Sequence, residues 1–329
     1  MSDVLDRGPR IEEEARVLND LIVEVEKVVL GQRPLIERLV IGMLADGHLL
    51  LEGVPGLAKT LLIRSLAKAI GLSFHRIQFT PDLLPSDITG TQIYNPQSGA
   101  FSVRQGPVFA HIILADEINR APAKVQSALL EAMQERQVTI GEETHDLPRP
   151  FFVLATQNPL EQQGTYPLPE AQLDRFLLKI LVDYPSADVE CRIVDQMARS
   201  DPDTEIRTVM SAEQLASAMA TMDEVYVDER VTRYIVELVR ATRDPATVGL
   251  SDLTPLVETG ASPRASIALG MAGRGHAFLQ GRAYVTPQDV KSVAHDVLRH
   301  RILLSYEAEA QEVPVEEIIT RILDNVEVP

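Results

Sequence analysis

The chain is 329 residues long, enough for two domains, and its 45% hydrophobic and 24% charged residues exclude a largely disordered protein. The formal net charge of −17 argues against non-specific binding of nucleic acid or anionic membrane, which depends on Lys and Arg. The single cysteine excludes an internal disulfide, and the apolar runs are too short to cross a bilayer, so we expect a soluble, cytoplasmic protein.

The first elements predicted are two helices followed by a strand, a loop and a third helix. Apolar residues recur at helical spacing from 11 to 45, with a break at Gly31-Gln32-Arg33-Pro34. The apolar run at 48–53 predicts a short buried strand. Residues 60–71 have one apolar face and end in a glycine, which predicts an amphipathic helix.

The loop between this strand and this helix reads GVPGLAKT and departs from the phosphate-binding pattern G-x-x-x-x-G-K-[ST] only at Ala58. Phosphate binds at a helix N-terminus because unpaired N–H groups and the helix dipole point at it. Gly53 and Gly56 would supply the tight turn, Lys59 would reach the outer phosphates and the Thr60 hydroxyl would bind Mg²⁺. We expect a negative φ at Ala58, where a methyl group costs little.

Three further apolar runs, at 74–79, 111–117 and 151–159, alternate with helical or looped segments. This alternation predicts an α/β fold with a parallel sheet covered on both faces. Polar and apolar residues alternate within 89–103 and 136–147, so both stretches predict β-hairpins. These hairpins are either functional insertions or plain edge hairpins that extend the sheet.

Polar side chains follow two of the buried runs. Asp116 and Glu117 end the run at 111–117, roughly 60 residues after the phosphate loop, which is the spacing of a strand-helix-strand-helix passage. The first carboxylate could hold Mg²⁺ and the second could polarise an attacking water. Residues 156–158, which include Asn158, could position water or sense the γ-phosphate.

Strand patterns cease after residues 180–190, and amphipathic helices follow at 231–244, 263–281 and 287–304. We therefore place a domain boundary near Tyr184-Pro185. The histidines are scattered and no H-E-x-x-H occurs, so the sequence predicts no zinc site.

Three arginines are candidates for contacting the γ-phosphate: Arg120, Arg175 and Arg264. An arginine delivered to that phosphate accelerates transfer by about 10³ to 10⁵. If a neighbouring subunit supplies it, hydrolysis depends on assembly.

Taken in order, GVPGLAKT, ILADEINRAP, ATQNP, TYPLPEAQLDRF and SPRAS resemble the motifs of the MoxR family of AAA+ ATPases, and the similarity covers roughly residues 12 to 310. The resemblance implies an ATP-binding core at 1–184, which includes the N-terminal helices, and an all-α helical lid at 185–329. It implies ATP and Mg²⁺ as cofactors. The residues assigned by the resemblance are Gly31 and Gln32 near the adenine; Gly53, Val54, Pro55, Gly56, Leu57, Ala58, Lys59 and Thr60 in the phosphate loop; Asp116 and Thr60 at Mg²⁺; Glu117 as the base; Asn158 as sensor 1; Arg175 as the arginine finger; and Arg264 as the sensor 2 arginine.

The resemblance also implies a ring, a hexamer in relatives, in which the two hairpins face a central pore. Relatives act as chaperones that mature partner proteins or insert metals, often with partners that carry von Willebrand factor A domains. Whether Arg264 serves its own subunit or the next is left open, as is the identity of the client protein.

Three other functions stay open at this point. One is a DNA-directed motor or a chelatase subunit, although the acidic composition argues against nucleic acid as a partner. Another is a monomeric P-loop kinase or GTPase, which would not need Arg175. The last is a nucleotide-gated scaffold with little hydrolysis, which the presence of Glu117 argues against.

Overall fold

The computed structural model describes residues 2–54, 56–97, 99–159, 164–201 and 203–329. The first part of the chain is an α/β unit with two hairpins. Its elements are α1 (Ser2–Glu26), α2 (Arg33–Leu44), β1 (Leu49–Glu52), α3 (Lys59–Ile70), β2 (Phe74–Gln78), α4 (Pro85–Thr89), β3 (Gly90–Asn95), β4 (Ala100–Gln105), β5 (Ile112–Asp116), α5 (Ala123–Glu135), β6 (Gln137–Ile140), β7 (Glu143–Asp146), β8 (Phe152–Gln157), α6 (Glu170–Leu173) and β9 (Leu178–Leu181).

The second part is mainly helical. Its elements are α7 (Ala187–Met197), α8 (Ala212–Asp223), α9 (Glu229–Arg243), β10 (Val257–Thr259), α10 (Pro263–Leu279), α11 (Pro287–Leu298), β11 (Leu303–Leu304), α12 (Tyr306–Ala310) and α13 (Val315–Asn325). The short antiparallel pair of β10 with β11 was not predicted, because two or three residues carry no readable alternation.

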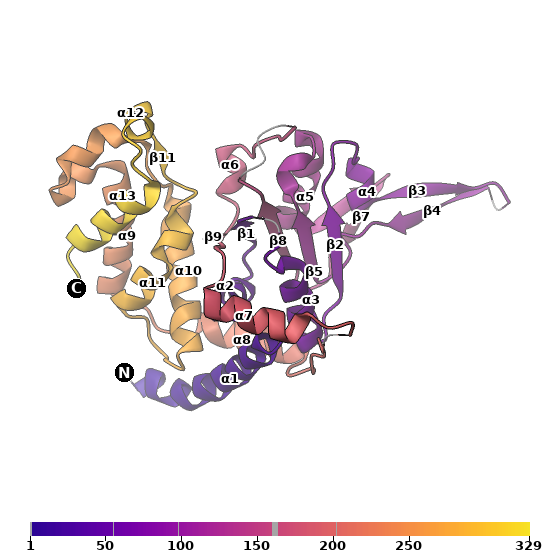
Figure 1. Cartoon of the computed structure of the whole chain (residues 1–329), viewed down its shortest axis with the longest axis horizontal. Helices are drawn as coiled ribbons and strands as arrows, with labels where there is room; N and C mark the ends of the chain where they lie inside the picture. The colour runs from indigo at the N-terminus through magenta and orange to yellow at the C-terminus, as the bar shows by residue number, and fades with distance from the viewer. Residues whose placement is uncertain (1, 55, 98, 160–163, 202) are drawn as a thin grey trace.

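Among the described residues, five strands form the central sheet in the order β2-β5-β8-β1-β9, and all their pairings are parallel. The predicted parallel sheet is therefore confirmed. Parallel neighbours need crossover connections, and β1 lies between β8 and β9, which come much later in the chain (Figure 1). This order brings the C-terminal ends of β1, β5 and β8 to one edge of the sheet.

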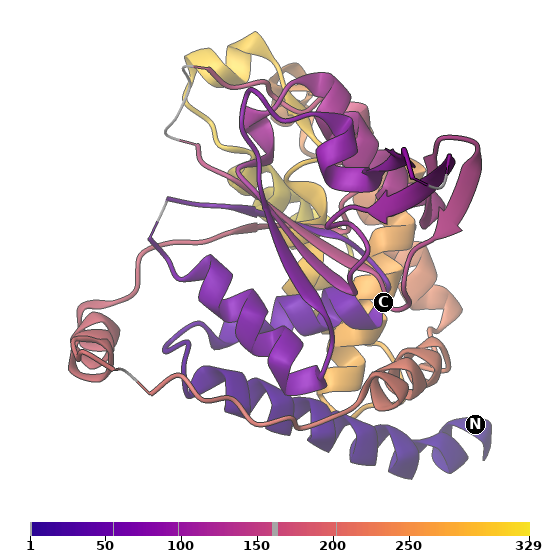
Figure 2. The same ribbon diagram turned by 90° about the vertical axis from the view of Figure 1, so that its right-hand side faces the viewer.

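Both faces of the sheet are covered, as the apolar runs predict. Side chains alternate along β1, so Leu49 and Leu51 pack in one hydrophobic cluster while Leu50 packs in the other. The first cluster is covered by α1, α2, α3 and the C-terminal helices, and the second by α5 (Figure 2). Strands buried on both faces explain the continuous apolar sequences at these positions.

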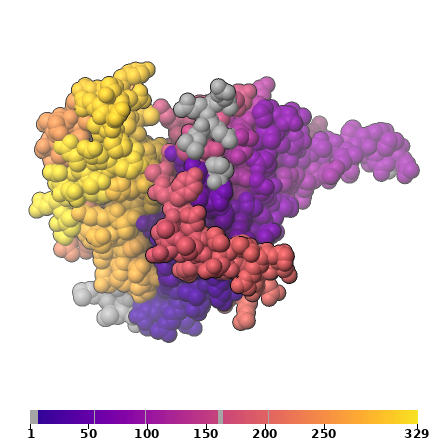
Figure 3. All heavy atoms as spheres, viewed as in Figure 1, coloured from indigo at the N-terminus to yellow at the C-terminus, as the bar shows by residue number. Residues whose placement is uncertain are grey.

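The two predicted hairpins are present, and each is a separate two-stranded sheet, so neither extends the central one. The pair β3–β4 projects from the body as an arm (Figures 1 and 3). Most of its described side chains are exposed, including Tyr94 at 52% and Phe101 at 66%, whose ring centroids lie 5.2 Å apart. An exposed apolar pair on a projecting arm is suited to contact another chain.

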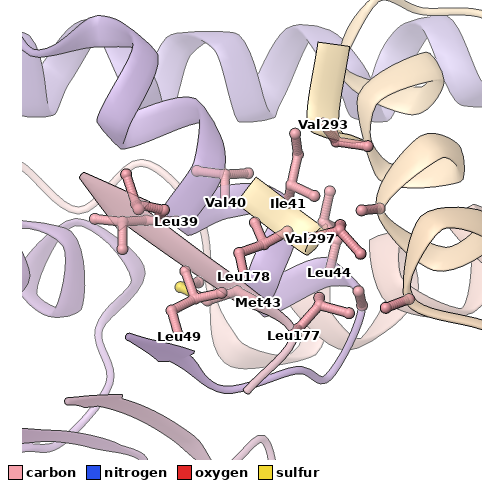
Figure 4. Packing of buried hydrophobic residues seen from close by; sticks show 14 of the residues in the cluster. Leu39, Val40, Ile41, Met43, Leu44, Leu49, Leu177, Leu178, Val293 and Val297 are labelled. Atoms are coloured by element: carbon pink, nitrogen blue, oxygen red, sulfur yellow. The ribbon is translucent and has the colours of Figure 1, made fainter. Parts of the chain in front are cut away.

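The C-terminal helices pack directly on the α/β unit. Figure 4 shows Val293 and Val297 of α11 close to Ile41 and Leu44 of α2 and to Leu177, which precedes β9. All of these side chains belong to one buried cluster. A shared hydrophobic core therefore joins the α/β unit to the C-terminal helices. The domain boundary near Tyr184 stays a proposal.

No helix in the part of the chain that the structure describes combines the length and the apolar character needed to cross a membrane.

One buried histidine links the sheet to α5. His48 is 5% exposed; its Nδ1 accepts a hydrogen bond from the Val153 N–H at 3.0 Å, so its Nε2 donates to the Met133 carbonyl at 3.1 Å. Burial lowers the pKa of His48 to about 3, and the nearby charge of Arg136 acts in the same direction. The folded chain therefore keeps this imidazole neutral.

We expect the free energy of unfolding to fall as the pH drops below about 6.5, because His48 then binds a proton in the unfolded chain but stays neutral in the folded chain. The contribution is complete above pH 6.5 and lost progressively towards the folded pKa of about 3. The loss from His48 amounts to about 2 kcal/mol at about pH 5. Urea unfolding at several pH values checks this, and a His48→Gln variant should show a shallower pH dependence. Equal slopes for both proteins would contradict it.

Candidate functional site

The loop between β1 and α3 lies at the edge of the sheet where the strands end. Gly53 is held close to the chain after β9: a Cβ at this position would lie 2.5 Å from the Val182 carbonyl oxygen, so only glycine fits. The Lys59 ammonium donates to the Gly53 carbonyl at 2.6 Å, which folds the lysine back over the loop. Val54 packs against the core, and Pro55 lies outside the described residues.

Ala58 corrects one sequence expectation. Its φ is +54° and its ψ is +22°, in the left-handed region, whereas we expected a negative φ. Helix α3 begins only at Lys59, so Ala58 still belongs to the turn, and Gly56 is also left-handed at +89°. Left-handed residues in such a turn curl the backbone and direct successive N–H groups into one concavity. The methyl group at this position is therefore a source of backbone strain.

We expect Ala58→Gly to raise the free energy of unfolding by up to about 1 kcal/mol, since glycine adopts this φ without strain while losing somewhat more entropy on folding. Nucleotide affinity should be kept, because the backbone N–H groups stay in place. Chemical denaturation of the two proteins measures the difference. Ala67→Gly, within α3, is the matched control and should destabilise the chain. If Ala58→Gly lost as much stability as the control, Ala58 would not be a strained residue.

The acidic pair sits across from the loop at the end of β5. The Thr156 hydroxyl on β8 joins the two acids: it accepts from the Glu117 N–H at 2.8 Å and donates to Asp116 Oδ1 at 2.6 Å. The Asp116 side chain is 16% exposed and the Glu117 side chain 24% exposed. Thr156 thus orients the Asp116 carboxylate and holds the main chain at Glu117, a role the sequence did not assign.

Glu117 is itself in the left-handed region, with φ of +56°. For a residue with a side chain this conformation is uncommon, and it occurs at sites where the surrounding structure enforces it. Its Oε2 accepts a hydrogen bond from Gln78 Nε2 at 2.7 Å and lies 3.2 Å from Arg120 Nε. Arg120 therefore pairs with the predicted base, and Gln78 reaches the same oxygen from the neighbouring strand.

Arg76 is a site residue that sequence reasoning missed. Its Nη2 lies 2.6 Å and its Nε 3.0 Å from Asp116 Oδ2, and it also donates to the Gln78 side chain. Arg76 and Gln78 are two positions apart on β2, so their side chains lie on the same face of the strand. The pairing of β2 with β5 sets Gln78 opposite Asp116. In the sequence, the alternation of polar Arg76 and Gln78 near the end of the run at 74–79 could have indicated that both face the site.

A cavity of about 520 Å³ joins these groups. It is lined by Gly53, Gly56, Leu57, Ala58, Lys59, Thr60, Leu61, Arg76, Asp116, Glu117, Thr156, Gln157 and Asn158. Burial lowers the pKa of Lys59, while the charges of Asp116, Glu117 and Glu52 oppose that shift. The structure therefore brings the phosphate loop, the acidic pair and Asn158, which is buried, around one space.

A second cavity, of about 390 Å³, continues from the first and shares the wall made by residues 56–58 and Leu61. Its far wall is α7 with the residues before it, including Tyr184, Ile193 and Met197. Gln32 lines this cavity, and its Oε1 is buried without a hydrogen-bond partner in the described part of the chain. Gly31 beside it faces Val189 of α7 so closely that a Cβ would clash at 2.5 Å.

The two cavities form one cleft with a polar end and an apolar end, which is the distribution of polarity in a nucleotide. The apolar end would take a flat base, and the orphaned Gln32 oxygen could accept a hydrogen bond from an exocyclic amino group such as that of adenine. Thr60 and Asp116 place hydroxyl and carboxylate oxygens at the polar end, the ligands that Mg²⁺ uses together with substrate phosphates. The residues present therefore fit a Mg–nucleotide.

The two arginines predicted to act in catalysis do not line this cleft. The Arg175 guanidinium donates to the Leu130 carbonyl of α5 at 3.1 Å, and Arg264, at the start of α10, lies 4.0 Å from Asp174. Neither arginine is among the residues lining either cavity. Their proximity to Asp174 places both near the segment between α6 and β9.

Comparisons with known proteins agree with this geometry. Residues 48–178 match the family described as ATPase family associated with various cellular activities (AAA), and residues 252–322 match an AAA lid domain. A crystal structure of a Cytophaga hutchinsonii protein is similar over 98% of this chain and 97% of its own, with 49% identity and a TM-score of 0.92.

Three relatives are similar over most of their length. The chaperone MoxR1 of Mycobacterium tuberculosis is 49% identical over 316 residues, which are 96% of this chain and 83% of the relative. The protein YeaC of Bacillus subtilis is 44% identical over 95% of each chain. The protein MoxR of Paracoccus denitrificans is 35% identical over 84% of this chain and 86% of its own.

Proposed function

Because the chain belongs to the MoxR family of AAA ATPases, we propose that it is a ring-forming chaperone that hydrolyses ATP at sites shared between neighbouring copies. The core binds Mg–ATP in the cleft between the phosphate loop and α7. The energy of hydrolysis then changes the relative positions of core and lid and remodels a partner protein. Maturation of a partner, including metal or cofactor insertion, belongs to this proposal.

The observation that supports a shared site best is the separation of Arg175 from its own cleft. The cleft has the phosphate loop, the carboxylates and Asn158, but neither Arg175 nor Arg264 is among its lining residues. An arginine that stabilises the transition state must reach the γ-phosphate. Arg175 is exposed and lies outside its own cleft, so it is suited to complete the cleft of the next copy, while Arg264 could serve either copy.

The chemistry assigned to each group follows from its place. Lys59 and the loop N–H groups balance the charge of the phosphates, and Thr60 and Asp116 would hold Mg²⁺, which neutralises charge on the β- and γ-phosphate oxygens when bound. Glu117 takes the proton of the water that attacks the γ-phosphorus, while the bond to the bridging oxygen breaks and ADP leaves. Asn158 positions that water, and Arg175 of a neighbour meets the charge on the transferred group.

The arm formed by β3 and β4 is the part of the chain proposed to contact the client. It projects beyond the body and carries exposed Ile93, Tyr94 and Phe101 (Figure 3). In a ring, such arms from several copies could converge on one partner. A hexamer, a partner with a von Willebrand factor A domain and a cytoplasmic location complete the proposal; they rest on the family resemblance.

The experiment that tests a shared site is ATPase activity against protein concentration. We expect the rate per chain to rise with concentration and to level off once rings are complete, in parallel with the assembled fraction seen by analytical ultracentrifugation. A rate per chain that stays constant down to fully monomeric protein would refute the shared site and favour a monomeric P-loop enzyme.

A DNA-directed motor is the second candidate, and one observation counts against it. The net charge of −17 gives little basis for the phosphate contacts that non-specific DNA binding requires. Stimulation of hydrolysis by DNA at physiological salt would favour it nevertheless.

A further inference from the structure

The segment that carries Arg175 is held by three consecutive residues from the helical region. Arg299, His300 and Arg301 follow α11, and each donates to a main-chain carbonyl between residues 174 and 179. Arg299, His300 and Arg301 are more than a hundred positions away from this segment in the sequence. The contact follows directly after α11, whose Val297 lies near Leu177 and Leu178 (Figure 4).

Arg301 is the centre of this contact. Its side chain is 3% exposed, and its Nε donates to Asp174 Oδ1 at 2.7 Å. The other nitrogens donate to the main-chain carbonyls of Asp174, Phe176, Leu177 and Val297. An arginine has five N–H donors, so all five are used. Four of the five acceptors lie within residues 174–177.

His300 and Arg299 extend the same contact on either side. The buried His300 donates from Nε2 to the Phe176 carbonyl at 3.0 Å, and Arg299 donates to the Lys179 carbonyl at 2.6 Å. Asp174 also accepts from the Ser262 hydroxyl at 3.1 Å, at the start of α10. The main chain immediately before and after Arg175 is therefore anchored to the helical region.

Arg175 itself is exposed, and apart from the hydrogen bond of its guanidinium to the Leu130 carbonyl, its attachment to this segment determines where the guanidinium can reach. A displacement of about 1 Å in a reacting group can cost on the order of 10²-fold in rate. If the helical region moves relative to the core, the carbonyls held by Arg301 move with it. A movement of the helical region would then shift Arg175 through this contact.

We propose that Arg301, supported by Arg299 and His300, is a positioning residue that places Arg175 for the neighbouring subunit. The proposal rests on the proposed function, because it requires Arg175 to act on a neighbour's ATP. Arg301 does not touch the nucleotide cleft of its own chain. Its loss should therefore resemble the loss of the finger and leave nucleotide binding intact.

The test uses the full-length Arg301→Lys variant, since lysine keeps the charge but cannot span acceptors arranged for a planar fork. We expect kcat to fall about 10- to 100-fold. KM, and the Kd of a fluorescent ATP analogue with Mg²⁺, should stay within about twofold of the native values. Mixing with Lys59→Ala subunits should restore part of the activity, because those subunits donate an intact Arg175. Lost nucleotide affinity, or no rescue by Lys59→Ala subunits that do rescue Arg175→Ala, would overturn the proposal.

Two further variants separate positioning from folding. Arg282→Lys is the matched control: Arg282 pairs with the buried Asp289 inside the helical region, so the variant should lower the thermal midpoint while kcat is unchanged below the transition. Asp174→Asn keeps the side-chain shape and removes the negative charge beside Arg301, which provides a second route if Arg301→Lys does not fold. We expect it to lower kcat with unchanged Kd.

The outcomes also separate this proposal from the function on which it rests. An Arg175→Ala variant with native turnover would refute the shared site itself, and Arg301 would then have nothing to position. A slow Arg175→Ala variant together with native kcat in both Arg301→Lys and Asp174→Asn would leave the shared site intact and refute the positioning role alone.

Discussion

We expect the Glu117→Gln variant to bind Mg–ATP with native affinity and to hydrolyse it about 10² to 10⁴ times more slowly, the range typical for loss of a positioned base. Glutamine has nearly the same shape, so it can remain at the end of β5 beside Gln78. It cannot take a proton from water at neutral pH. Binding measured with a fluorescent ATP analogue and turnover measured by phosphate release separate the two effects.

The control for this prediction is Glu131→Gln, which removes an exposed carboxylate from α5. It should leave turnover unchanged within about twofold, since surface substitutions remote from special features have small effects. Native turnover in Glu117→Gln would remove Glu117 from the catalytic role. Loss of nucleotide binding in the same variant would show instead that Glu117 supports the shape of the cleft.

The second large effect is expected for Arg175→Ala, which should lower turnover by about 10³ to 10⁵ because the charge on the transferred phosphoryl group loses its partner. Lys59→Ala should also be inactive, for lack of phosphate binding in its own cleft. When the two inactive variants are mixed, an Arg175→Ala copy has an intact cleft and a Lys59→Ala copy has an intact finger. A contact between them forms a complete site, so partial activity should return.

Mixing the Arg175→Ala and Lys59→Ala variants at several ratios distinguishes a shared site from one within a single chain. Activity should be highest when both variants are abundant and should vanish at either extreme. Arg233→Ala is the control, since Arg233 is an exposed arginine of α9 whose ion pair with Glu229 lies away from the cleft. Its turnover should be native. An inactive Arg175→Ala variant with no recovery at any ratio would indicate that Arg175 acts within its own chain or supports its fold.

The sequence predicted those parts of the site that are local or follow from parallel topology. The phosphate loop leads into α3, which begins at Lys59, because the apolar strand, the glycines and the helical pattern are adjacent in the chain. Asp116 and Glu117 meet that loop because parallel strands end at a common edge of the sheet. These relations hold for any right-handed strand-helix-strand arrangement, so they can be predicted without coordinates.

The sign of φ at Ala58 could not be predicted in the same way. Residue type favours a negative φ for alanine, but the loop must finish its turn before α3 begins at Lys59, and this constraint comes from the fixed ends of β1 and α3. The preference of one residue is worth about 1 to 2 kcal/mol, which the surrounding structure can outweigh. The strain was therefore visible only in the folded chain.

Taken by itself, the sequence determined the family, the α/β core, the two hairpins and the acidic pair, because each depends on short-range patterns. The tertiary structure alone decided which distant groups meet: Arg76 and Gln78 at the acidic pair, α7 over the apolar end of the cleft, and Arg301 at Asp174. The physical reason is that strand order and helix packing bring together residues far apart in the chain, such as Arg301 and Asp174, which are 127 positions apart. No local pattern in the chain records such a contact.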